Sequence, residues 1–118
     1  MEQPKPLGLV VVAAGGVPAR ATANMVDPTM RVAAQSFTVQ AHPGNTGLIY
    51  VRMGAQGDDR VVLRHTIGII AVPVSATQGP FPQLSFSKPV GSAGFNMASI
   101  YIDAGVNGNG AIVTCVEG

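Results

Sequence analysis

The sequence is short of charge and of large aromatic side chains. Only 11% of its 118 residues are charged, aromatic residues make up 5%, and tryptophan is absent. An average soluble domain has about 25% charged residues. Seven basic and six acidic residues leave a net charge of +1, so electrostatic repulsion gives little protection against association. We therefore interpret the chain as one that works with much of its surface covered by other protein.

The same scarcities argue against several classes of partner. The basic residues are scattered and form no cluster with stacking aromatics, so we expect no nucleic-acid partner. The first six residues are polar and interrupted by proline, and the apolar run over 7–14 is too short to cross a membrane. Cys115 is the only cysteine, which rules out an internal disulfide. These features predict folding in a reducing cytoplasm, with no membrane partner.

No set of residues in the sequence has the pattern of a catalytic or metal site. His42 and His65 lie far apart, and a zinc ion needs further ligands. Ser36, His42 and Asp27 are the residue types of a catalytic triad, but no nucleophile elbow or oxyanion loop accompanies them. The Gly15-Gly16 turn lacks the glycine spacing of a nucleotide-binding loop. We therefore expect neither an enzyme nor a bound cofactor.

What the sequence does contain is typical of an all-β fold. Branched aliphatic residues alternate with polar ones, and 15 glycines and 9 prolines separate the apolar runs. No helical periodicity extends beyond a turn. The pattern predicts a single β-sandwich, jelly-roll or Greek-key like, of about eight or nine short strands. The expected strands are 7–13, 17–22, 36–42, 48–53, 60–64, 67–72, 84–86, 99–103 and 111–117.

The chain divides into a short arm and one domain. Pro4 and Pro6 favour an extended N-terminal arm over residues 1–6, because proline fixes φ and donates no backbone hydrogen bond. Residues 7–118 form the sandwich domain. Within it, the irregular stretch 75–96 is expected to cross between the sheets.

Two loops rich in asparagine and glycine predict hairpins. Residues 43–47, which read PGNTG, separate the strand 37–41 from the strand 48–51. Residues 107–110, which read NGNG, separate the last two strands and carry the strongest short-range hairpin signal in the chain.

The two loop regions also carry a family resemblance. Residues 37–51, which read FTVQAHPGNTGLIYV, resemble a strand–turn–strand signature of small virion structural proteins of tailed bacteriophages. Residues 100–105, which read IYIDAG and are followed by Gly108, Gly110 and Val113, resemble a second run of the same proteins near the C-terminus. Arg52 stands where the family pattern has glycine.

The small one-domain members that the chain resembles most are capsid cement or decoration proteins. The resemblance implies a protein made in the host cytoplasm and located on the capsid surface of the virion. It implies binding to the major capsid protein and to copies of itself, as a dimer or trimer, which stabilises the head. The alternative is a tail- or fibre-associated virion module or a carbohydrate-binding β-sandwich. The expected interface residues lie in the arm, on two strands and in an apolar knob: Gln3, Pro4, Pro6, Tyr50, Pro80, Phe81, Pro82 and Tyr101.

Overall fold

The computed structural model describes residues 4–15, 18–27, 30, 32–54, 65–72, 82–88 and 94–117. The strands are β1 (Pro4–Val11), β2 (Ala19–Arg20), β3 (Ala33–Ala41), β4 (Ile49–Met53), β5 (His65–Ile70), β6 (Gln83–Ser87), β7 (Phe95–Asn96), β8 (Ile100–Ala104) and β9 (Gly110–Glu117). A short 3-10 helix, η2 (Met97–Ser99), precedes β8. The all-β prediction is thereby confirmed.

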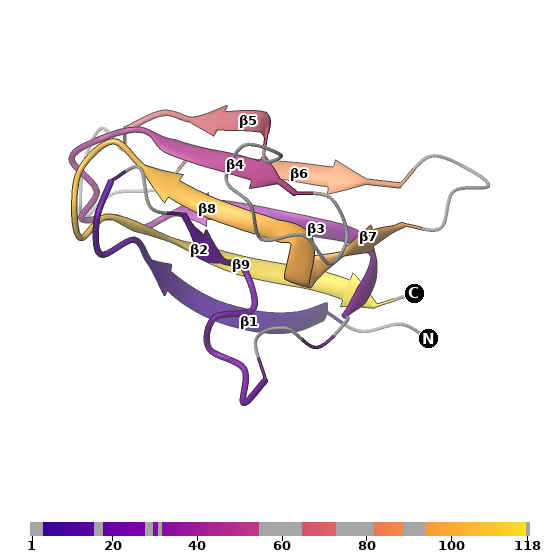
Figure 1. The fold of residues 1–118 in the computed structure, drawn as a ribbon. Helices are drawn as coiled ribbons and strands as arrows, with labels where there is room; N and C mark the ends of the chain where they lie inside the picture. The colour runs from indigo at the N-terminus through magenta and orange to yellow at the C-terminus, as the bar shows by residue number, and fades with distance from the viewer. Residues whose placement is uncertain are drawn as a thin grey trace.

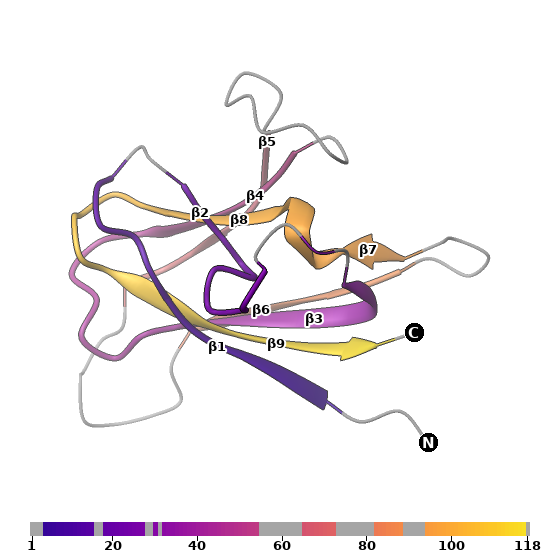
Figure 2. The same ribbon diagram turned by 60° about the horizontal axis from the view of Figure 1, so that its bottom comes forward.

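The strands form two antiparallel sheets packed as layers (Figures 1 and 2). In sheet A the order is β1-β9-β3-β6, with β7 also paired to β3; in sheet B it is β2-β8-β4-β5. Each position in sheet A and the equivalent position in sheet B therefore hold two strands that are consecutive in sequence: β1 and β2, β9 and β8, β3 and β4, and β6 and β5. This interleaving is the arrangement of a jelly roll, in which the chain passes repeatedly from one sheet to the other.

The core between the sheets is built from alternate residues of the central strands. Phe37 and Val39 of β3 face inward with Val113 of β9, opposite Val51 of β4 and Ile102 of β8, and all are almost fully buried. Phe37 contributes most of the aromatic packing. Its ring stacks on Phe86 at 4.8 Å between centroids and meets Phe95 edge-on at 5.0 Å.

Neither of the two expected hairpins forms. β3 belongs to sheet A and β4 to sheet B, and the same division separates β9 from β8. The loops 42–48 and 105–109 are therefore arches that carry the chain across the core. Figure 2 shows them at one end of the sandwich, with both termini at the other. Turn residues allow the chain to reverse, but they do not decide whether it reverses within a sheet or between sheets.

Two asparagines join the arches. Asn45, in the first arch, donates from Nδ2 to the carbonyl oxygen of Gly110 at 2.8 Å and accepts from the amide of Gly110 at 3.0 Å. Asn109, in the second arch, accepts from the amides of Thr46 and Gly47, both at 2.9 Å. Both asparagines are buried, and each pairs its side chain with backbone groups of the neighbouring crossing: Asn45 with the first residue of β9, and Asn109 with the first arch.

Two glycines lie at close contacts at this end of the sandwich, Gly47 against the second arch and Gly110 against β1. A Cβ on Gly47 would lie 2.6 Å from Cγ2 of Val106, and a Cβ on Gly110 would lie 2.5 Å from the carbonyl oxygen of Val10. Asn107 extends the same network to the loop after β1, because its Oδ1 accepts from the amide of Gly15 at 2.7 Å.

The first strand differs from the expected N-terminal arm. β1 begins at Pro4, and Pro4, Lys5 and Pro6 lie opposite Val116, Cys115 and Thr114 of β9. Lys5 also forms an ion pair with Glu117, 3.0 Å from Nζ to Oε1. The prolines are tolerated because β1 is an edge strand of sheet A, where amides on the free side need no partner.

We predict that Asn109→Ala destabilises the fold by about 2–3 kcal/mol, because it leaves two backbone amides without their acceptor. Asn107→Ala, two positions away, removes one exposed hydrogen bond and should cost about 1 kcal/mol or less. Urea unfolding followed by circular dichroism measures both changes. Equal effects of the two substitutions would contradict the role given to the buried asparagine.

Candidate partner interface

The outer face of sheet A carries no charged side chain on the described parts of its four main strands. Strand alternation turns three side chains of each main strand outward, and none of them carries a charge. They are Pro6, Leu9 and Val11 of β1, Ile112, Thr114 and Val116 of β9, Ser36, Thr38 and Gln40 of β3, and Gln83, Ser85 and Ser87 of β6.

This face has an apolar side and a polar side. Leu9, Val11 and Ile112 are 39%, 51% and 37% exposed, and Leu9 lies directly opposite Ile112. Towards β6 the residues become hydroxyls and amides, and Thr38 and Ser85 are joined by a hydrogen bond of 3.1 Å between their hydroxyl oxygens. A surface of this kind loses little on desolvation, because no ion has to be stripped of water. It is therefore suited to being covered by another protein.

The outer face of sheet B has a different chemistry. Tyr50 and Arg52 of β4 and Tyr101 and Asp103 of β8 point outward from neighbouring strands, with Tyr50 opposite Asp103 and Arg52 opposite Tyr101. Arg20 of β2 lies opposite Tyr101 on the other side. The two predicted interface tyrosines are thus brought onto one face, diagonally across β4 and β8.

The charged side chains on this face contact one another and the two tyrosines, although Nε of Arg52 is buried without a hydrogen bond among the described residues. Arg52 places Nη2 3.2 Å from Oδ2 of Asp103, and its guanidinium lies 5.5 Å from the centre of the Tyr50 ring. Arg20 lies 5.4 Å from the centre of the Tyr101 ring and donates to the carbonyl oxygen of Ala98 at 2.8 Å. Asp103 is 3% exposed and Tyr101 only 2%. Tyr101 therefore leaves almost no surface for a partner, contrary to the sequence prediction.

The remaining predicted interface residues are placed as follows. Pro6 is exposed on the outer face of sheet A, and Tyr50 is half-buried on sheet B. Pro4 lies in β1 opposite Val116. Pro82 is half-buried, and its carbonyl oxygen accepts from the amide of Ala41 at 2.9 Å. Gln3, Pro80 and Phe81 lie outside the described residues, as does the expected strand 60–64.

Sequence reasoning missed the arginines and the aspartate of sheet B. Arg20 and Arg52 belong to the basic residues that are scattered along the sequence, and Asp103 lies far from both of them in the chain. A signal was available, because Tyr50-Val51-Arg52 and Tyr101-Ile102-Asp103 repeat the same alternation of polar and buried residues. That alternation places each aromatic–charged pair on one face of a strand.

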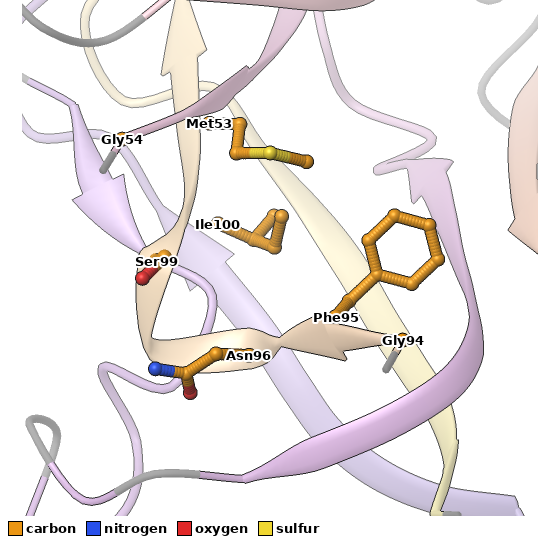
Figure 3. A pocket seen from close by; sticks show the side chains of 7 residues that line it. All are labelled: Met53, Gly54, Gly94, Phe95, Asn96, Ser99 and Ile100. Atoms are coloured by element: carbon orange, nitrogen blue, oxygen red, sulfur yellow. The ribbon is translucent and has the colours of Figure 1, made fainter. Parts of the chain in front are cut away.

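A pocket of about 340 Å³ opens beside β7 and the end of β4. Figure 3 shows the side chains of Met53, Phe95 and Ile100 turned toward one another, whereas Asn96 and Ser99 point away. Asn96 uses its Oδ1 to accept from the amides of Val32 and Ala98. None of its described lining residues is titratable.

The described ranges contain no group of three or more His, Cys, Asp or Glu placed to hold a metal ion. No helix among them is long and apolar enough to cross a membrane.

In comparisons with protein families, curated proteins and solved structures, nothing matches this chain. Its function therefore has to be argued from its own residues.

We predict that Arg52→Met destabilises the fold by about 2 kcal/mol, because it removes the ion pair between Arg52 and the buried carboxylate of Asp103. Lys88→Met, which removes a positive charge from the end of β6, is the control and should change the free energy of unfolding by less than about 0.5 kcal/mol. Both values come from urea unfolding. A change of that small size for Arg52→Met would show that the ion pair does not stabilise sheet B.

Cys115 is fully buried on the inner face of β9. Burial, followed by the nearby charge of Glu117, raises the pKa of its thiol above the value of 9.0 of an exposed cysteine. We expect slow alkylation by iodoacetamide at about pH 8 in the native protein and fast alkylation in urea, because the thiolate is the nucleophile. The native state holds this proton to a higher pH than the unfolded chain, so stability should fall as pH rises above about 9. Equal alkylation rates in the two states would contradict this placement.

Proposed function

We propose that this chain is a structural protein of a bacteriophage virion that binds the outside of the major capsid shell and stabilises the head by bridging neighbouring subunits. The observation that carries the proposal is the uncharged outer face of sheet A, with Leu9, Val11 and Ile112 exposed along its β1 side. The resemblance of residues 37–51 and 100–105 to small phage virion proteins supports the same conclusion. Jelly rolls are frequent in virion proteins, although the fold alone does not fix a function.

The chemistry of the face suits a cementing role. Capsid cement needs no catalysis; it needs surface that can be buried at low desolvation cost. Four strands present hydroxyl, amide and aliphatic groups without an ion among them, so the face can be covered without leaving an unpaired charge. Weak contacts of one copy become effective when it engages several capsid subunits at once, because the later contacts are intramolecular.

The outer face of sheet B is less suited to a ligand. A sugar-binding face needs an aromatic ring that is free to stack, but Arg52 lies over the ring of Tyr50 and Tyr101 is buried. The side chains that would contact a carbohydrate are thus engaged with one another. We therefore prefer the capsid-binding function to the carbohydrate-binding alternative.

The location of the protein tests the proposal directly. Gel electrophoresis and mass spectrometry of purified virions should detect the chain, and antibody labelling under the electron microscope should cover the whole head. Particles that lack the protein should release their DNA at a lower temperature. Its absence from virions would overturn the proposal, as would label confined to the tail or an unchanged release temperature.

A matched pair of substitutions tests the binding face. Thr114→Lys introduces a charge at the centre of sheet A, and Thr66→Lys introduces the same charge on the outer face of sheet B, opposite Arg52. Burial of an unpaired ammonium should weaken binding of the first variant to particles lacking the protein by about tenfold or more. The second variant should bind like the unmodified protein. Equal binding of both variants would exclude the outer face of sheet A as the contact.

A further inference from the structure

Within the described part of the chain, nothing blocks the outer edge of β6. Sheet A ends at β6, and in the described ranges no strand pairs with its outer side. Two hydrogen bonds fix which residues face that side: the amide of Ala41 donates to Pro82 at 2.9 Å, and the amide of Lys88 donates to Gln35 at 2.8 Å. Hydrogen-bonded pairs alternate along an antiparallel ladder. Leu84 and Phe86 therefore bond to β3, opposite Val39 and Phe37.

By the same alternation, Gln83, Ser85 and Ser87 direct their amides and carbonyls away from the sheet. Such a row of unpaired groups is a template for another strand. The segment contains no proline and no charge, which are the usual devices that prevent pairing at an edge.

The opposite edge of sheet A is blocked. Pro4 and Pro6 donate no hydrogen bonds, and Nδ2 of Asn24 donates to the carbonyl oxygens of Leu7 and Leu9, at 3.3 and 2.7 Å. In sheet B, β2 has only two residues, and the pairing of β5 with β4 is interrupted between Val51 and Arg52. Figure 1 shows β1 and β6 at opposite edges of their sheet. The regular, open edge is that of β6.

We propose that β6 pairs with β6 of a second copy of this chain, antiparallel about a two-fold axis that passes between the two copies of Ser85. This register places Ser85 opposite Ser85 of the second copy, Gln83 opposite Ser87, and Leu84 opposite Phe86. The sequence Gln83–Ser87 is self-complementary in this arrangement: polar residues meet polar residues on the outer face, and apolar residues meet apolar residues on the inner face. No like charges are brought together.

The pairing forms about six backbone hydrogen bonds between the copies, two at each of the three outward residues. It joins the two A sheets into one and doubles their uncharged outer face. An edge of this length buries little area, so we expect a dissociation constant in the roughly micromolar range. The inference stands on the β6 edge alone and does not depend on binding to a capsid.

Introducing a charge at Ser85 tests this geometry, because only a two-fold axis that passes between the two copies of this residue places it opposite itself. Ser85→Lys and Ser85→Glu should each weaken the dimer at least about tenfold, since each variant faces its own charge. An equimolar mixture of the two variants should restore dimers, as lysine then faces glutamate. Sedimentation velocity over a range of concentrations measures the three cases, and Ser85→Ala, which keeps the backbone amide, should remain dimeric.

Circular dichroism and the urea midpoint establish that each variant is folded. Ser85→Pro gives a second test, because it removes an outward amide that makes no bond to β3, and it should give a folded monomer. An unmodified protein that stays monomeric up to about 1 mM, some thousandfold above the expected dissociation constant, would overturn the proposal. So would a trimer, or charge variants that dimerise as well as the unmodified chain. Virion composition is read separately, so failure of the dimer and failure of the capsid role are distinguishable.

Discussion

Passage of the chain between two sheets leaves backbone groups at the crossing that neither ladder can satisfy, and the fold depends on how these groups are paired. Asn45 and Asn109 perform this pairing reciprocally, each from one arch to the strand or loop of the other. The amide of Val12 and the carbonyl of Asn109, at 2.8 Å, add the loop after β1 to the same end. These polar contacts thus connect the loop after β1, the first arch and the second arch, the three places at this end where the chain crosses between the sheets.

The strands could be predicted because each has one inward face. Phe37, Val39 and Ala41 alternate with polar residues, and the structure buries all three of them. The arches could not be predicted in the same way. Paired strands in a hairpin and facing strands in an arch both turn alternate residues toward the same core, so the periodicity of the sequence is identical in the two cases. Only contacts between distant residues, such as Asn45 with Gly110, select the arch.

The predicted interface residues also fall into two groups: those whose exposure follows from their own chemistry and those whose exposure depends on distant parts of the chain. Proline at an exposed edge could be predicted from its missing donor, and Pro6 lies on the outer face of sheet A. Tyrosine is amphipathic and is therefore a reasonable prediction for an interface, but Tyr101 is buried because neighbouring side chains on the outer face of sheet B cover it. Arg20 is one such neighbour, and its position depends on the pairing of β2 with β8 across a long separation in sequence. Composition and local pattern contain no information about that pairing.

The low charge of the sequence has a spatial arrangement that composition does not disclose. Arg52 and Asp103 are paired with each other on sheet B, and Lys5 and Glu117 at one end of sheet A. The outward side chains of the strands from β1 to β6 carry no charge. The two edges of sheet A differ. Prolines and Asn24 block the edge at β1, whereas no described strand pairs with the outer side of β6. A neutral face that is closed on one side and open on the other can extend in one direction only, so pairing through β6 yields a closed pair of copies rather than an endless sheet.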